Sequence, residues 1–167
     1  MAGSFLVLGL DPGIAITGYG LVRESAGALC AVDYGVITTP ARTPLPERLQ
    51  QLYRQLAALI AAHRPDSAAV ESLFFSANVK TAMAVGQARG VALLALAEAG
   101  LPLAEYKPTE VKQAVAGFGG ADKTQMQQMV TALLDLDAVP QPDDAADALA
   151  VAICHINTSH FQRLIDE

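Results

Sequence analysis

One short apolar segment near the N-terminus constrains the fold of this chain more than any other part of it. Residues 5–13 read FLVLGLDPG, and five of the six residues before Asp11 are apolar, the other being Gly9. Such a run is typical of a central strand that is covered on both faces. Asp11 therefore stands at or near the buried end of a strand, where an ionised carboxylate is costly unless it is paired, protonated or bound to a metal. We expect the rest of the chain to supply its partners.

Length, charge and cysteine usage narrow the class of protein. A chain of 167 residues, 52% of them apolar, fits one domain with a sizeable core, so we expect residues 1–167 to form a single domain. The net charge of −6, from 11 basic and 17 acidic residues, by itself favours a small-molecule or protein partner over nucleic acid. Cys30 and Cys154 lie in apolar surroundings without metal-like spacing, which predicts reduced core thiols. The apolar runs are too short to span a membrane, so we expect a soluble, cytoplasmic protein that is not exported.

Hydrophobic periodicity predicts strands first and then alternating strands and helices. Three sequential strands joined by short turns predict an antiparallel meander. The run SAAVESLFF, residues 67–75, follows an amphipathic helix and fits a strand parallel to the first, with Glu71 in its middle. We therefore expect an α/β fold with a mixed five-stranded sheet and helices on both faces. The expected strands are residues 5–11, 14–23, 28–38, 67–75 and 101–106, with a turn at Pro12-Gly13. The expected helices are residues 44–63, 79–99, 108–116, 123–136 and about 143–160.

Besides Asp11, three further acids stand where a solvated surface charge fits poorly. Glu71 interrupts an apolar strand, and Asp144 and Asp147 lie on one face of a helix that otherwise reads DAADALAVAIC. Asp143 or Asp144 could equally serve as an ordinary helix N-cap. Because Asp143 and Asp147 are i,i+4 neighbours, spacing alone does not choose between Asp143 and Asp144 as the second acid of this helix.

If these acids converge, their negative charges need compensation, which two divalent cations would supply. Hard oxygen ligands without clustered His or Cys select Mg²⁺ or Mn²⁺. Two such ions about 3.5–4 Å apart are the usual apparatus for in-line attack on a phosphodiester. His155 lies eight residues after Asp147, about 12 Å along a helix axis, so we expect it to serve in packing or behind the ligands.

Several motifs together resemble a known family. The chain is similar to the RuvC family of Holliday junction resolvases in LGLDPG, TGYG, VESLFF, GQARG and DAADALAVAICH, in the right order and spacing over nearly its whole length. The resemblance implies a ribonuclease H-like fold, a homodimer, and metal-dependent symmetric nicking of two strands of a four-way DNA junction in homologous recombination and DNA repair. It also implies a branch-migration complex as a partner.

Carried over residue by residue, the family's acidic tetrad falls on Asp11, Glu71, Asp144 and Asp147. The resemblance thereby selects Asp144 over Asp143. It implies that these four residues are catalytic and hold two Mg²⁺ or Mn²⁺ ions, with Asp11 bridging them.

The resemblance also implies contacts with DNA. The family's junction-contacting aromatic matches Phe74, and its two basic residues match Lys112 and Lys123. From the residues alone, Phe74 could equally be core, and the lysines could be ordinary solvated residues. An exposed Phe74 could stack on an unpaired base, and Gly119-Gly120 before Lys123 could offer N–H groups to a phosphate. Three further residues on or beside the next helix could border the DNA path: Asn78, Lys80 and Arg89.

The helix expected from Val79 is rich in small residues and can approach another backbone closely. Paired cuts across a junction require two sites related by a twofold axis, so this helix is our candidate for an isologous interface. Burial of the helix against its own sheet is the alternative.

Two other classes of protein share parts of this pattern. Asp11-Pro12-Gly13 followed by Thr17-Gly18 also resembles the first phosphate loop of actin-like kinases and ATPases, but those close a nucleotide between two domains, and 167 residues leave no room for a second. A non-catalytic junction-binding module would use the acids only as caps and surface charge. The presence of all four acids disfavours it.

Overall fold

The five strands form one mixed sheet in the order β3-β2-β1-β4-β5 in the computed structural model, which describes residues 3–72 and 78–166. β1, β2 and β3 form an antiparallel meander and β4 runs parallel to β1, as the sequence predicts. β5 runs parallel to β4. The strands are β1 (Phe5–Asp11), β2 (Ile16–Ser25), β3 (Ala28–Thr38), β4 (Ser67–Glu71) and β5 (Leu103–Tyr106). The helices are α1 (Leu45–His63), α2 (Val79–Glu98), α3 (Pro108–Ala116), α4 (Lys123–Leu133) and α5 (Asp143–Asp166).

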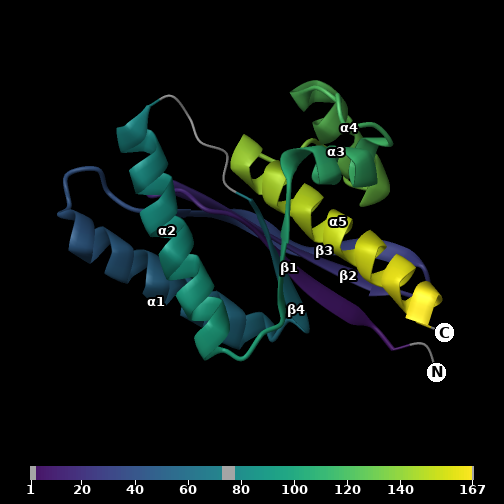
Figure 1. The fold of residues 1–167 in the computed structure, drawn as a ribbon, viewed down its shortest axis with the longest axis horizontal. Helices are drawn as coiled ribbons and strands as arrows, with labels where there is room; N and C mark the ends of the chain where they lie inside the picture. The colour runs from purple at the N-terminus through teal and green to yellow at the C-terminus, as the bar shows by residue number, and fades with distance from the viewer. Residues whose placement is uncertain (1–2, 73–77, 167) are drawn as a thin grey trace.

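The two faces of the sheet are covered by different helices (Figure 1). Alternation along β1 sends Leu6, Leu8 and Leu10 into the core shared with α1 and α2. Val7 points the other way, into the core beneath α3, α4 and α5. Asp11 has the same parity as Val7, so it faces α5.

Helix α5 lies unusually close to the sheet because glycines stand beneath it. A Cβ added to Gly9 would lie 2.1 Å from the carbonyl oxygen of Ala148, and one added to Gly18 would lie 2.0 Å from that of Asp144. Any side chain at these positions would push the helix away. Gly9 of LGLDPG and Gly18 of TGYG therefore set the distance between α5 and the strands β1 and β2, of which β1 carries Asp11.

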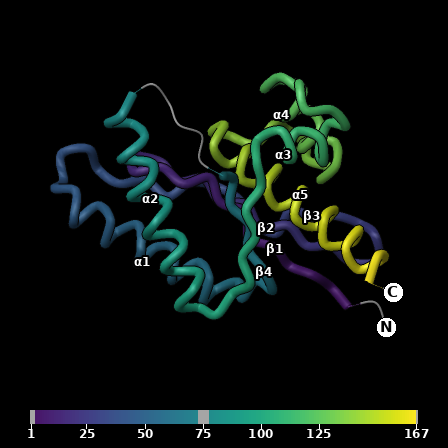
Figure 2. Tube along the Cα trace, viewed as in Figure 1, coloured from purple at the N-terminus to yellow at the C-terminus, as the bar shows by residue number. Residues whose placement is uncertain are grey.

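Both ends of the described chain lie together at one end of the sheet (Figure 2). The guanidinium of Arg163, near the end of α5, stacks on the ring of Phe5 with 5.1 Å between the guanidinium carbon and the ring centroid.

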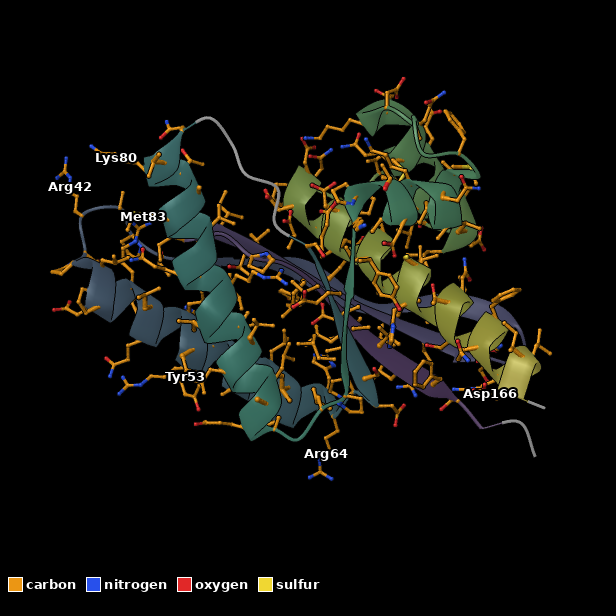
Figure 3. The ribbon with its side chains drawn as sticks, in the orientation of Figure 1. Arg42, Tyr53, Arg64, Lys80, Met83 and Asp166 are labelled. Atoms are coloured by element: carbon orange, nitrogen blue, oxygen red, sulfur yellow. The ribbon has the colours of Figure 1, made fainter. Side chains whose placement is uncertain are left out.

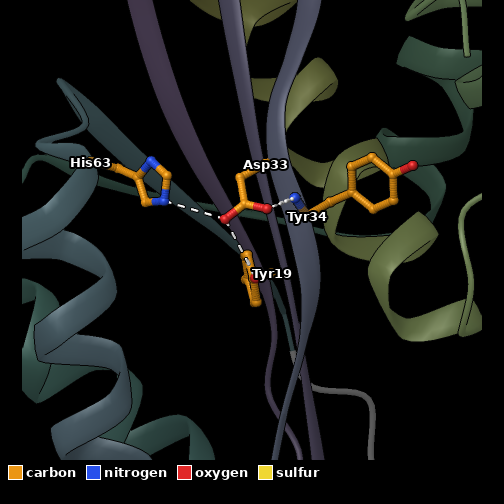
Figure 4. Close-up of polar contacts among 4 residues, drawn as sticks. All are labelled: Tyr19, Asp33, Tyr34 and His63. Atoms are coloured by element: carbon orange, nitrogen blue, oxygen red, sulfur yellow. Dashed lines mark hydrogen bonds and ion pairs between the residues drawn. The ribbon is translucent and has the colours of Figure 1, made fainter.

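A polar contact joins the end of α1 to the edge strand β3. There the Asp33 carboxylate lies 3.3 Å from Nε2 of His63 and accepts hydrogen bonds from the Tyr19 hydroxyl and the Tyr34 N–H (Figure 4).

Apart from shifts of one or two residues at the ends of elements, four details differ from the sequence-based expectations. β4 ends at Glu71 instead of running to residue 75, because its partner β5 ends at Tyr106, which pairs with Glu71. α4 stops at Leu133, and Asp135 beyond it has a left-handed φ of 51°, which a continuing helix does not allow. α5 continues to Asp166. Cys30 is exposed and not in the core, because it lies on an outward position of the edge strand β3.

His155 serves in packing, as expected. Its ring is buried, and its two nitrogens lie 2.7 Å from the hydroxyl oxygens of Ser67 and Tyr106. The Ser67 hydroxyl also lies 3.1 Å from the Pro102 carbonyl, to which it donates. A neutral imidazole satisfies all of these partners, and burial lowers the pKa of His155.

In the described part of the chain, no helix is both long enough and apolar enough to cross a membrane.

Candidate active site

Asp11 and Glu71 are the last residues of two neighbouring parallel strands. β1 and β4 pair up to Leu10 and Val70, so the two acids lie one step beyond that pair. Glu71 has the parity of Ala69, which packs in the core beneath α5. Both carboxylates therefore stand at the same edge of the sheet and on the face that α5 covers.

The first turns of α5 bring two more acids to this edge. The backbone of Asp144 rests on Gly18, which is the register partner of Asp11 across the β1–β2 pair. One turn later, the carboxyl group of Asp147 comes close enough to that of Asp11 to raise its pKa. The close approach of α5 to the sheet thus determines how near these acids come to Asp11.

Burial is the largest influence on the acids of this site, and their mutual repulsion adds to it. Burial, with further contributions from Asp147, Asp144 and Glu71, raises the pKa of Asp11 to about 7. Burial is also the main cause of the raised pKa values of Glu71 and Asp147. Asp11 and Asp147 therefore both resist ionisation in the folded protein.

Two lysines oppose this charge across a cleft. Lys112 of α3 lowers the pKa of Glu71, and Lys123 of α4 lowers that of Asp147, although burial outweighs both effects. A cavity of about 360 Å³ is lined by Glu71, Asp147 and both lysines, among others. On the other side of Glu71 lies a cavity of about 200 Å³ that Asp11 also lines. The structure thus brings Lys112 and Lys123 together with the acids.

Spacing left open whether Asp143 or Asp144 is the second acid of the site, and the two residues have different surroundings in the structure. One Asp143 carboxylate oxygen lies 2.6 Å from the Lys123 amine, and the other accepts a hydrogen bond of 3.0 Å from the Gln127 amide. The hydrogen bond from Lys123 lowers the pKa of Asp143. Asp143 thereby ties α5 to α4, whereas Asp144 raises the pKa of Asp11. Sequence reasoning did not find this ion pair, because it depends on how α4 packs on α5.

The N-terminus of α4 is capped by the side chain of Asp122. Asp122 accepts a hydrogen bond from the N–H of Gln125 at 2.8 Å, and the Gln125 side chain accepts one from the N–H of Asp122. Two donors that a phosphate at this helix start could have used are therefore already satisfied.

The remaining expected DNA contacts differ in exposure. Phe74 lies outside the described residues. Asn78 caps α2 and accepts hydrogen bonds from the N–H groups of Lys80 and Thr81. Lys80 is exposed at the outer end of α2, near Met83 (Figure 3). Arg89, by contrast, is mostly buried, with 11% of its side chain exposed.

Within residues 3–72 and 78–166, no three His, Cys, Asp or Glu side chains stand close enough together to hold a metal ion as they are. The predicted acids come from three elements, β1, β4 and α5. Ionised carboxylates repel one another, so such a group closes only when cations or protons offset its charge.

A mixed sheet in this order, with acids at the ends of β1 and β4 beneath α5, defines a ribonuclease H-like protein. The chain belongs to the family of crossover junction endodeoxyribonuclease RuvC, whose model matches residues 7–155. It is thus an endodeoxyribonuclease of a family that depends on divalent metal ions, and the predicted fold class is confirmed.

Individual relatives agree with this assignment over nearly their whole length. The crossover junction endodeoxyribonuclease RuvC of Chloroflexus aggregans is 64% identical over 152 residues, which cover 91% of this chain and 93% of the relative. That of Desulfitobacterium hafniense is 58% identical over 153 residues, covering 92% and 93%. The structure of T. thermophilus RuvC in complex with a Holliday junction substrate superposes with a TM-score of 0.90 at 36% identity, covering 95% of this chain and 96% of the other.

Proposed function

We propose that the protein resolves four-way DNA junctions in the cytoplasm by paired symmetric nicking, in homologous recombination and DNA repair. Asp11, Glu71, Asp144 and Asp147 are its catalytic acids. The observation that carries this proposal is the gathering of four acids at one edge of the sheet, where burial and mutual repulsion raise the pKa of Asp11 to about 7. The T. thermophilus neighbour with its Holliday junction substrate supports the choice of DNA.

The donor set fits divalent cations. Its ligands are carboxylate oxygens, which Mg²⁺ and Mn²⁺ prefer, and charge from two ions would offset the repulsion that separates them. Bound there, the ions would activate water and stabilise the leaving oxygen of the scissile phosphodiester. Two such ions would also change the net charge from −6 to about −2 before DNA is contacted.

The chain's own residues orient the phosphate. Lys112 and Lys123 line the same cavity as Glu71 and Asp147, so their amines stand where they can hold its non-bridging oxygens. When the phosphate binds, Lys123 leaves its ion pair with Asp143 and contacts the phosphate instead. The loss of the ion pair costs little stability, because both of its side chains are exposed. The family resemblance implies that cleavage leaves a 5′ phosphate and a 3′ hydroxyl. Asn78 and Lys80 border the path of the DNA on the side where α2 begins. Phe74, which lies outside the described residues, is proposed as a further DNA contact from the family resemblance alone.

The exposed side of α2 supports a homodimer. Ala88, Ala92 and Leu96 bury one side of this helix in its own core, which was the alternative reading of its small residues. Val79 and Met83 are 70% and 60% exposed on the other side. Further exposed positions follow along the same side: Gly90 and Leu94. A second copy of α2 would cover this apolar stripe, and a branch-migration complex is a further partner of the dimer.

The decisive experiment compares a synthetic four-way junction with a matched linear duplex in the presence of each divalent metal in turn. We expect paired nicks in the junction alone. Asp11→Asn should bind the junction as tightly as the wild type and cleave it roughly 100-fold more slowly or worse, because a metal ligand is lost. Asp137→Asn, at an exposed acid outside the cleft, is the control and should cleave normally.

Substantial nicking by Asp11→Asn would count against this mechanism. Tight junction binding by the wild type without cleavage under any metal would instead favour the non-catalytic junction-binding module.

A further inference from the structure

Arg89 joins three elements beneath the candidate active site. From α2, its Nη1 donates a hydrogen bond of 2.7 Å to the backbone carbonyl of Glu71, the last residue of β4. Its Nη2 lies 2.6 Å from a carboxylate oxygen of Glu105, on β5. Since β4 and β5 are neighbouring parallel strands, one planar guanidinium spans both of them.

These contacts leave Arg89 poorly placed to bind DNA. Only 11% of its side chain is exposed, and both terminal nitrogens have partners in the protein. A phosphate could reach it only by displacing Glu105 and uncovering a buried cation, which is costly. Lys80, on the same helix, has none of these restraints on its exposed amine.

The contact with Glu71 holds the point where the chain leaves the sheet. In the same peptide group, the Ser72 N–H donates to the Tyr106 carbonyl at 2.7 Å, so both polar atoms of this peptide are held. The end of a strand otherwise opens easily. Arg89 also lines, together with Asp11 and Glu71, the cavity of about 200 Å³.

We propose that Arg89 is a positioning residue for Glu71. Its guanidinium fixes the backbone of Glu71 so that the carboxylate is held toward Asp11 and Asp147, and it does not itself contact the DNA. The inference rests on the proposed function, in which Glu71 is a metal ligand. Lysine cannot replace arginine here, because a single ammonium does not reproduce the fork that spans both strands.

The test separates metal binding from DNA binding. Arg89→Lys keeps the charge but loses the fork, and the double variant Arg89→Gln/Glu105→Gln removes the fork without leaving an unpaired charge. Outer partners of metal ligands typically contribute about 10-fold to 100-fold in metal affinity. We expect both variants to need roughly 10-fold more Mn²⁺ for half-maximal cleavage and to bind Mn²⁺ correspondingly more weakly in direct titration without DNA.

The junction affinity of Arg89→Lys and of the double variant should not change. In metal-free buffer, their dissociation constants for the four-way junction should stay within about twofold of the wild-type value, because the cationic surface that meets DNA is unchanged. Lys80→Gln is the comparison on the same helix and should weaken junction binding without changing the Mn²⁺ requirement. Circular dichroism checks that each variant is folded.

Two results would overturn the inference. A folded Arg89→Lys that loses junction affinity as Lys80→Gln does, with an unaltered Mn²⁺ requirement, would make Arg89 a DNA contact. Unchanged Mn²⁺ binding in the folded double variant would show that Glu71 does not depend on the guanidinium. Failure of the proposed function looks different, because the wild type itself would then neither cleave junctions nor bind Mn²⁺.

Discussion

Asp11 opposes the stability of the fold that it serves. Its pKa lies near 7 instead of near 4 because burial and three neighbouring acids disfavour its charged form. As pH rises from about 4, the unfolded chain releases this proton before the folded protein does. The stability that the protonated group contributes is complete below pH 4 and is lost as pH rises to about 7.

Asp11→Asn should therefore raise the melting temperature of the metal-free protein at pH 8. The amide is neutral and has the shape of the carboxyl. We expect a gain on the order of 2–4 kcal/mol at pH 8 that shrinks toward pH 4, measured by thermal unfolding in chelator. Asp137→Asn should show no such dependence on pH, and equal melting temperatures for Asp11→Asn and the wild type at pH 8 would contradict the charge argument.

At the scale of residues, the sequence reveals costly charges better than it reveals their partners. Asp11 and Asp147 stand out because apolar neighbours surround them along the chain. The pairing of Arg89 with Glu105 leaves no such signal. It depends on β5 lying beside β4 and on α2 crossing beneath their ends, which only the folded chain establishes.

Helix α5 is the element that assembles the site. It carries Asp144 and Asp147, and its distance from β1 and β2 depends on backbone contacts at Gly9 and Gly18. The helix was predictable from its apolar run, and the meander from its turns. The end of β4 was not, because SLFF continues a strand-like pattern after Glu71 while the partner strand β5 is already finished.

Gly18→Ala should displace the start of α5. The added methyl group would meet the carbonyl oxygen of Asp144 at 2.0 Å, and backbone cannot move aside as a side chain can. We expect a loss of roughly 1–3 kcal/mol in urea unfolding together with a large loss of cleavage at fixed Mg²⁺. Gly35→Ala is the matched control in the same sheet, since its methyl group meets only the ring end of Tyr19, and it should cost markedly less and keep cleavage.

At the scale of the whole molecule, the sheet separates two tasks. The face beneath α5 carries the acids, and the opposite face is covered by α1 and α2 (Figure 1). On its outer side α2 exposes Val79, Met83 and Leu94. Paired nicking needs two such molecules in a fixed relation, and α2 lies where it can join them without covering α5.

Met83→Asp should weaken the homodimer without unfolding the protein. Met83 is 60% exposed in the protomer, so a charge there costs little until a second α2 approaches. Sedimentation velocity at micromolar concentration should show a dimer for the wild type and a shift toward monomer for the variant. Leu164→Asp, at an apolar residue near the end of α5 that is 72% exposed, should remain dimeric. A wild type that sediments as a monomer would remove the interface from the proposal.

The stacking of Arg163 on Phe5 has a practical consequence for experiments. Phe5 and Asp11 are the two ends of β1, so Phe5 and the Arg163 that stacks on it lie about 20 Å from Asp11, at 3.3 Å per residue of strand. Fluorophores or affinity tags attached at either terminus would stand clear of the catalytic edge. A donor and an acceptor dye, one on each terminus, would begin within close range of each other and would report on the detachment of α5 from the sheet.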